Sequence, residues 1–186
     1  MTKTQKNLMT KVLLSKALKK LMREKPLPSI SVTEVAEVAG FRRQSFYYHF
    51  PDLYALLKWT LDQELNIHLG GKNAPATWEE GMLKIFSYIG KNRDFCLSAY
   101  TALGRETVRN LVGAEVNDAV RTVITVEVAE FSLPEQTITY LTRFFVGGIS
   151  NILEDWLLGR LDMSPEEIVF HMHNTEKVLI AGYQAK

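Results

Sequence analysis

The sequence predicts an all-helical protein, and two observations support this fold class. Apolar residues recur three and four positions apart along most of the chain, and no stretch shows the sustained alternation of a half-buried strand. Serine-led capping sequences begin at Ser31 and Ser164, where helices are expected to start. With 186 residues and 46% hydrophobic content, the chain can bury one or two small cores. We expect domains over residues 1–50 and 51–186, connected by a helix over about 52–69.

The first helix is expected over residues 4–23, because Pro26 and Pro28 follow and the residue before a proline disfavours the helical conformation. The second helix should begin near Val32. Ser31 and Glu34 precede and open it as a capping box, in which the hydroxyl and the carboxylate satisfy amides that have no partner within the helix.

A glycine turn is expected to separate this second helix from a third. Gly40 can adopt the left-handed conformation that ends a helix, and the next helix then begins around Arg42. Two short helices about such a turn are typical of a helix-turn-helix motif, whose second helix enters the major groove of DNA. The pattern therefore predicts a DNA-binding domain of three helices over residues 1–50.

Side chains at the start of the third helix are suited to reading bases. They are Arg42, Arg43, Gln44 and Ser45. Arginine can donate two hydrogen bonds to O6 and N7 of guanine, and glutamine can pair with N6 and N7 of adenine. Tyr47, Tyr48 and His49 can add phosphate contacts, so double-stranded DNA is the expected partner.

The run GFRRQSFYYHF resembles the signature of the TetR family of bacterial regulators. The matching positions are Gly40, Ser45, Phe46, Tyr47, His49 and Phe50. The resemblance implies phosphate contacts by Thr33, Ser45, Tyr47 and His49. It implies base contacts by Arg43, Gln44 and Tyr48, to which the arginine chemistry adds Arg42. Within the family, the form Arg-Arg-Gln-Ser-Phe-Tyr is most similar to activators of dihydroxyacetone kinase operons.

Two positions depart from the family pattern. Arg42 stands where a small capping residue of the third helix is usual. Leu53 stands where a lysine at the start of the fourth helix commonly holds a phosphate, so this DNA anchor is in question.

Charge is distributed unevenly along the chain. Residues 1–50 carry ten Lys and Arg against three acidic residues, whereas residues 51–186 carry twelve against eighteen. The basic segment suits the phosphate backbone, and the acidic remainder would be repelled from it. The alternative is that the lysines of the first helix are simply solvent-exposed and do not contact DNA.

Beyond residue 52 the pattern stays helical. Gly70, Gly71, Asn73 and Pro75 form the clearest break in the chain. Helices are expected over residues 78–92, 94–103, 105–128, 134–158 and 165–183. Ser164 is the expected cap of the last helix.

The segment around Gly147 and Gly148 predicts close packing of helices, because each glycine inside a helix costs about 1 kcal/mol relative to alanine. Four residues lie four apart on one stripe: Phe144, Gly148, Ile152 and Trp156. The TetR resemblance implies that the last two long helices pair with those of a second copy in a homodimer. An ordinary core helix within one chain is the alternative.

Aromatic residues of the C-terminal domain are candidates for an effector pocket, which the resemblance implies. The five expected to line it are Trp78, Phe86, Phe95, Tyr100 and Tyr140. Aromatic residues at helical spacing are also typical of a plain core.

No enzyme, metal or cofactor signature accompanies these patterns. There is no Gly-rich phosphate loop and no nucleophile motif, and His171 and His173 lie two apart, so they face different ways on a helix. The N-terminus lacks the apolar run of a signal peptide and no stretch suggests a membrane span, so a cytoplasmic protein is expected. We expect a homodimeric repressor released from a palindromic operator by a small molecule. The alternative is an activator whose C-terminal domain binds a partner protein.

Overall fold

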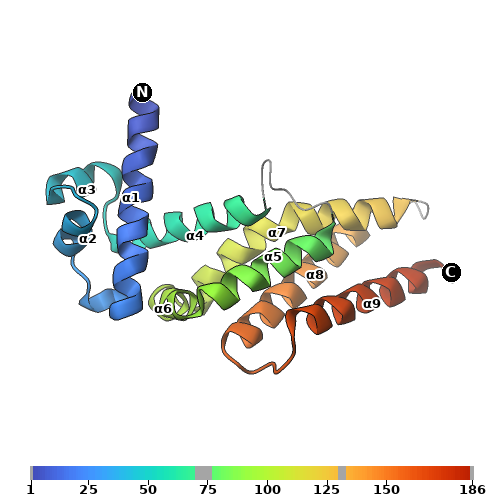
Figure 1. Cartoon of the computed structure of the whole chain (residues 1–186). Coiled ribbons are helices and arrows are strands. Elements are labelled where there is room, and N and C mark those ends of the chain that lie inside the picture. Colours follow the sequence, from blue (N-terminus) through green and yellow to red (C-terminus); the bar gives the residue numbers. More distant parts are fainter. Residues whose placement is uncertain (1, 70–76, 130–132, 185–186) are drawn as a thin grey trace. The chain divides into compact units, whose positions relative to one another are not determined.

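The computed structural model describes residues 2–69, 77–129 and 133–184, and these residues form helices and turns without a strand (Figure 1). The helices are α1 (Lys3–Glu24), α2 (Val32–Val38), α3 (Arg43–His49), α4 (Leu53–Leu69), α5 (Trp78–Lys91), α6 (Arg93–Leu103), α7 (Arg105–Glu127), α8 (Glu135–Leu157) and α9 (Pro165–Gln184), with a short 3-10 helix η1 (Leu27–Ser29). The all-helical prediction is confirmed, and the predicted helix bounds agree to within one residue. The predicted break at Gly70, Gly71, Asn73 and Pro75 lies outside the described residues.

Packing divides the chain into two compact units. Unit 1 comprises Met1–Glu64 and Asn92–Val108, and unit 2 comprises Leu65–Lys91 and Arg109–Lys186. Unit 1 therefore holds α1, α2, α3, α6 and most of α4, whereas unit 2 holds α5, α8, α9 and most of α7. The predicted division into domains 1–50 and 51–186 stays a prediction. Unit 1 also contains residues that follow residue 50.

Unit 1 is built around α1, which packs against α2, α3 and α6. Its fully buried side chains come from several helices and include Leu14, Leu18, Val35, Phe46, Leu56, Leu57 and Phe95. Burial of such side chains stabilises the unit by about 1.5–3 kcal/mol each. These contacts fix α3 from its inner side and leave its outer side exposed.

Cys96, on α6, lies in the core of unit 1 with 8% of its surface exposed. Burial raises the pKa of its thiol to about 12, because the charged thiolate is disfavoured away from water. Cys96 is thus a small core residue that stays protonated.

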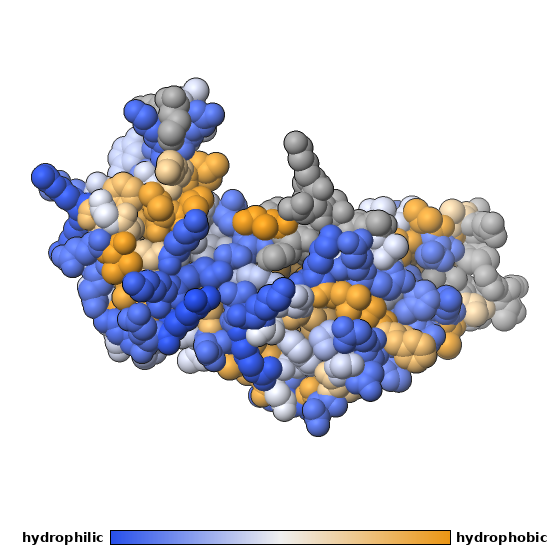
Figure 2. Space-filling view, in the orientation of Figure 1, coloured by the Kyte–Doolittle hydropathy of each residue, from blue (hydrophilic) through white to orange (hydrophobic). Residues whose placement is uncertain are grey.

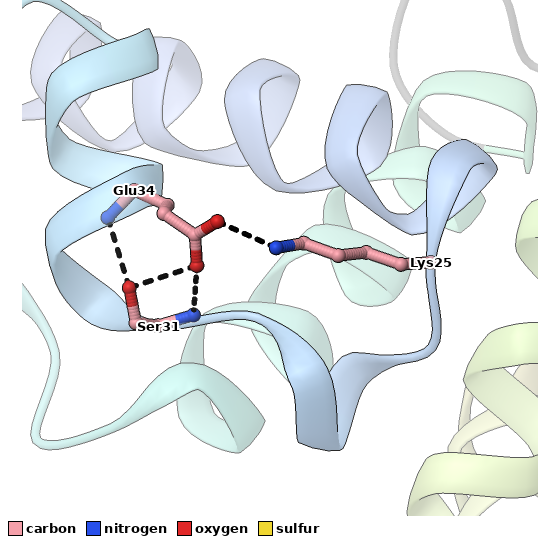
Figure 3. Close-up of polar contacts among 3 residues, drawn as sticks. All are labelled: Lys25, Ser31 and Glu34. Carbon is pink, nitrogen blue, oxygen red and sulfur yellow. Dashed lines mark hydrogen bonds and ion pairs between the residues drawn. The ribbon is translucent and has the colours of Figure 1, made fainter.

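The predicted capping box at the start of α2 is present (Figure 3). The amide of Glu34 donates to the hydroxyl of Ser31 over 3.2 Å, and the amide of Ser31 donates to the Glu34 carboxylate over 2.8 Å. Lys25, the residue that ends α1, donates to the same carboxylate over 2.5 Å. The bonds from Lys25 and Ser31 lower the pKa of Glu34 from 4.5 to about 2. This carboxylate therefore ties the end of α1 to the start of α2.

The core of unit 2 is formed by α5, α7, α8 and α9. Its buried cluster contains Met82, Ile85, Phe86, Val116, Ile149, Leu153, Ile168 and Val169. Ser164 caps α9 as predicted, since the Glu167 amide donates to its hydroxyl over 3.2 Å. The Trp156 indole N–H donates to the carbonyl of Met163 over 3.0 Å, which fastens the turn between α8 and α9.

Within the part of the chain that the structure describes, no helix is long and apolar enough to cross a membrane. Nor do any three His, Cys, Asp or Glu residues of these segments gather as a metal site would require.

Candidate nucleic-acid interface

The turn between α2 and α3 is fixed by backbone hydrogen bonds. Gly40 has a φ of 78°, the left-handed conformation predicted for it. The amide of Phe41 donates to the carbonyl of Ala36 over 2.8 Å, and that of Gly40 donates to Glu37 over 3.0 Å. This pair of bonds is a Schellman motif, which satisfies the last carbonyls of α2 and sets the direction in which α3 leaves. Space is open around Gly40, so its φ and not its size demands glycine.

One side of α3 is anchored and the other is exposed. Phe46 is fully buried and Phe50, the residue that ends the helix, is 5% exposed. The exposed side carries Arg42, Arg43, Gln44, Tyr47 and Tyr48, all predicted to contact DNA. Thr33 is also exposed, in the first turn of α2. The buried phenyl rings thus orient a row of polar and aromatic side chains outward.

Four predicted contact residues line one shallow hollow of about 350 Å³. They are Gln44, Ser45, Tyr48 and His49, and Thr10 of α1 and Phe41 complete its wall. Thr10 was not among the predicted contact residues. Helical periodicity shows that α1 has a polar face but not that this face borders α3, so the sequence contained no signal for it.

Arg43 and Tyr47 are paired on the outer face of α3. The Arg43 guanidinium donates to the Tyr47 hydroxyl over 3.2 Å, and its central carbon lies 5.5 Å from the centre of the tyrosine ring. A residue four positions further along a helix lies on the same face, so this pair holds the guanidinium along the helix. The predicted base contact and the predicted phosphate contact are therefore physically coupled.

His49 lies beside the ammonium group of Lys11. Partial burial and this positive charge lower the pKa of His49, which favours its neutral form. A neutral imidazole still has one N–H that can donate to a phosphate oxygen. The Lys11 ammonium lies 5.2 Å from the Phe50 ring centre and 5.7 Å from that of Trp59, so aromatic faces hold it at the end of α3.

Both departures from the family pattern have a structural counterpart. Arg42 occupies the capping position of α3 without a side-chain hydrogen bond to the helix. Leu53 is 8% exposed and belongs to the core of unit 1. At the start of α4, Asp52 instead accepts a hydrogen bond from the amide of Ala55 over 2.7 Å. Leu53 therefore has a packing role and offers no group to a phosphate.

The four residues of the predicted dimer stripe on α8 have different surroundings. Phe144 is 52% exposed, and Gly148 is exposed with open space around the position of a Cβ atom. Ile152 is half-buried. Trp156 packs edge to face on Phe86 within unit 2, with ring centres 5.0 Å apart. The N-terminal half of the stripe is therefore available to a partner, whereas Trp156 already has contacts in its own chain.

The five aromatic residues predicted to line an effector pocket are divided between the two units. Phe95 and Tyr100 belong to unit 1, and Tyr140 is 63% exposed. Phe86 is fully buried in the core cluster of unit 2. Trp78 lines a cavity in that unit.

This cavity, which we call the unit 2 cavity, has a volume of about 150 Å³ and lies among α5, α7, α8 and α9. Its lining residues are Trp78, Gly81, Met82, Ile85, Val116, Ala119, Val120, Val123, Ile124, Phe145, Ile149, Met172 and Glu176. All but Glu176 are apolar or aromatic. Sequence reasoning missed most of them because aliphatic residues of a cavity wall have the same periodicity as those of a filled core.

The site is that of a helix-turn-helix transcription regulator. It has a glycine turn, an α3 anchored by buried rings, and an exposed row of Arg, Gln and Tyr on that helix. Residues 76–176 match the family model TetR_C_8, whose description is "Transcriptional regulator C-terminal region". The chain belongs to the TetR family of transcriptional regulators, as the sequence resemblance predicted, and this family consists of regulators and not enzymes.

A protein named as an operon activator is among the similar proteins. The HTH-type dhaKLM operon transcriptional activator DhaS of Lactococcus lactis subsp. lactis (strain IL1403) is 28% identical over 91 residues, which is 49% of this chain and 49% of that protein. The chain thus aligns with about half the length of this relative.

Two solved structures share the fold across almost the whole chain. One is named "Dihydroxyacetone kinase operon activator DhaS", with a TM-score of 0.74 and 20% identity over 94% of this chain and 97% of that one. The other is a TetR transcriptional regulator from Rhodococcus sp. RHA1, with a TM-score of 0.61 and 17% identity over 94% and 98% of the two chains.

Proposed function

We propose that this chain acts as a homodimer that binds a partly palindromic operator in double-stranded DNA through α3 and is released from it by a small molecule bound in unit 2. The observation that carries the proposal is the exposed row on α3, which is held outward by the buried ring of Phe46. Arg42, Arg43, Gln44 and Tyr48 of this row are assigned to base edges. Thr33, Ser45, Tyr47 and His49 are assigned to phosphates.

The chemistry of these side chains supports sequence reading over general attraction to DNA. Lysine at the same positions would give a point charge, whereas the arginine fork matches the two acceptors of guanine and glutamine matches adenine. Phosphate contacts then fix the register of the helix in the groove without reading sequence. One set of side chains would therefore recognise the base sequence, and the other would hold α3 in place on the DNA backbone.

Exposed apolar side chains on α8 and α9 support the homodimer. On α8, Tyr140 and Phe144 are 63% and 52% exposed and stack with ring centres 6.4 Å apart. On α9, Phe170 and Val178 are 61% and 72% exposed. Hydrophobic residues reach the visible surface in several patches among hydrophilic ones (Figure 2). A dimer also meets a geometric need, because two readers must reach successive major grooves about 34 Å apart.

The unit 2 cavity supports regulation by a small molecule. A site for such a ligand is concave and mostly apolar, with few polar groups. The cavity has this composition, with Glu176 as its carboxylate. To release DNA, a ligand must bind more tightly to the conformation that cannot hold the operator, since equal affinity for both conformations shifts nothing.

Selection of binding sites from random duplex DNA by the purified protein tests the proposal. We expect enrichment of a palindrome whose affinity falls steeply with salt, because phosphate contacts release counterions. Arg43→Ala should enrich a degenerate site in the same selection. Recovery of no preferred sequence by the wild-type protein would overturn the DNA-reading role.

A second candidate is an activator whose unit 2 binds a partner protein in place of a small molecule. The names of the Lactococcus relative and of the first structural neighbour, both activators, favour it. Transcription from a promoter that carries the selected operator distinguishes the two candidates. Loss of the chain raises transcription if it represses and lowers transcription if it activates.

A further inference from the structure

Glu176 places a carboxylate on the wall of the unit 2 cavity. It lies on α9, half-buried, beside apolar residues such as Met172 of the same helix and Ile149 of α8. A carboxylate in apolar surroundings has lost part of its hydration, which is costly unless an opposite charge or hydrogen bonds replace it. The wall therefore has one position where a positive charge would be favoured.

The neighbours of Glu176 make its surroundings more negative. Burial and the carboxylates of Glu127 and Glu79 raise its pKa, while His173 and a hydrogen bond from Trp78 lower it. His173 is itself shared, because its Nδ1 lies 3.0 Å from a carboxylate oxygen of Glu79, although the two atoms are not aligned as a hydrogen bond. The Glu176 carboxylate thus has two further carboxylates and one histidine near it.

An aromatic ring borders the same part of the cavity. Trp78 lines the cavity and also stacks on His173, with ring centres 6.1 Å apart. The indole N–H of Trp78 donates to the Glu176 carboxylate, which holds that carboxylate on the wall and leaves its other lone pairs for a ligand. A carboxylate and an indole at one end of an apolar space form a site for an ammonium group attached to an apolar body.

The volume limits the size of that body. At about 150 Å³, the cavity matches an engineered apolar cavity that accepts benzene. Met82 and Met172 contribute unbranched, adaptable side chains to its wall, so the ring need not fit a rigid outline.

From this geometry we propose that the unit 2 cavity binds a small organic cation, an amine with a single ring or a comparable alkyl body, whose ammonium group pairs with Glu176 beside Trp78. The proposal rests on the effector site proposed above and adds the chemical class of the ligand. A ligand of the opposite charge would be repelled by the Glu176 carboxylate on the wall, and more weakly by those of Glu79 and Glu127 near it.

Calorimetric titration of the full-length protein without DNA tests this class with three probes that share one ring. They are 2-phenylethylamine, 2-phenylethanol and phenylacetate, which present a cation, a neutral hydroxyl and an anion. A hydrogen bond between charged groups favours the amine by roughly tenfold or more over the alcohol. Phenylacetate should show no measurable binding.

Two variants assign the preference to one carboxylate. Glu176→Gln should reduce the amine to the affinity of the alcohol while alcohol binding stays within about threefold, which also shows that the cavity is still folded. Glu166→Gln removes the same charge from an exposed position of α9 and should leave the preference intact.

Three results would overturn the proposal: equal affinity for amine and alcohol, a preference that survives Glu176→Gln, or no binding of any probe. Because the titration contains no DNA, each of these leaves operator binding to be judged by site selection. Operator binding with a failed titration rejects the ligand class alone, whereas loss of both rejects the proposed function as well.

Discussion

Arg43 and Tyr47 have different predicted partners in DNA although they touch each other on α3. Arg43→Ala should reduce the preference for the selected operator over random DNA, at about 1–3 kcal/mol for each lost base contact. Tyr47→Phe should weaken binding to both kinds of DNA, because a phosphate contact carries no sequence information, and should reduce the preference less than Arg43→Ala does, because the arginine is still present. Titration of each variant with both DNAs measures the difference. Equal losses for the two DNAs in Arg43→Ala would show that Arg43 does not read bases.

The coupling of this pair has its own measurable size. The Arg43 guanidinium donates to the Tyr47 hydroxyl over 3.2 Å, so removal of the hydroxyl also releases the arginine. The double variant should therefore lose less than the sum of the single losses, since residues in contact are not additive. A cycle of the four proteins on operator DNA gives this interaction energy.

Arg42 occupies the N-cap position of α3 but makes no capping hydrogen bond there. Arg42→Ser should stabilise unit 1 by about 1 kcal/mol, because a serine hydroxyl can accept from the first amides of α3. The same change should weaken operator binding through loss of the arginine. Thermal unfolding and DNA titration measure the two effects. Arg42→Ala is the matched control, expected to lose DNA affinity to the same degree without the gain in stability.

Glu34 makes the stability of unit 1 depend on pH in the acidic range. Its pKa is lowered to about 2 in the folded protein, chiefly by Lys25, so the stabilisation is present above the ordinary value of 4.5 and is lost as the pH falls from there toward 2. Glu34→Gln should melt below the wild-type protein at pH 6, and the gap should narrow down to pH 2.5. Glu37→Gln, on the same helix, controls for the charge change alone.

At the scale of elements, α8 offers a test of dimerisation that does not disturb the fold of one chain. A Cβ atom added at Gly148 meets no other part of the chain within 4 Å, and this position is exposed. Gly148→Leu should therefore keep or raise the melting temperature at low protein concentration, since glycine costs about 1 kcal/mol in a helix. In the proposed dimer the leucine would intrude on the partner helix and raise the dissociation constant of the dimer.

Sedimentation over a range of concentrations measures that dissociation constant. Gly148→Ala adds a single methyl group and serves as the control for helix propensity. A dimer of wild-type strength in Gly148→Leu would place the interface elsewhere than on this stripe.

Helices were predictable from the sequence because their signals are local. The capping residues Ser31 and Ser164 mark helix starts, and Gly40 marks the turn that ends α2, each through bonds within a few residues. The outward face of α3 followed from the same local pattern, since Phe46 fixes which side is buried. These locally encoded features position the candidate DNA interface, which is why its residues could be predicted.

At the scale of the whole molecule, packing between distant segments was not predictable. Phe95 and Tyr100 were grouped with Trp78 by their position in the chain, but α6 packs on α1 in unit 1. Periodicity indicates that a helix has an apolar face and does not indicate which element covers it. For the same reason, periodicity could not indicate that Thr10 borders α3, or that aliphatic residues of α7 line a cavity.

The buried thiol of Cys96 can report how often unit 1 opens. The chain contains one cysteine, and a pKa of about 12 leaves Cys96 almost entirely protonated and inert while α6 stays packed. An alkylating reagent therefore reacts in proportion to the fraction of molecules in which unit 1 is open when reclosing is fast, and no introduced label is needed. Operator DNA should slow this reaction if it holds unit 1 closed. The alkylation rate of Cys96 with and without DNA would therefore show whether binding at α3 stabilises the core beneath that helix.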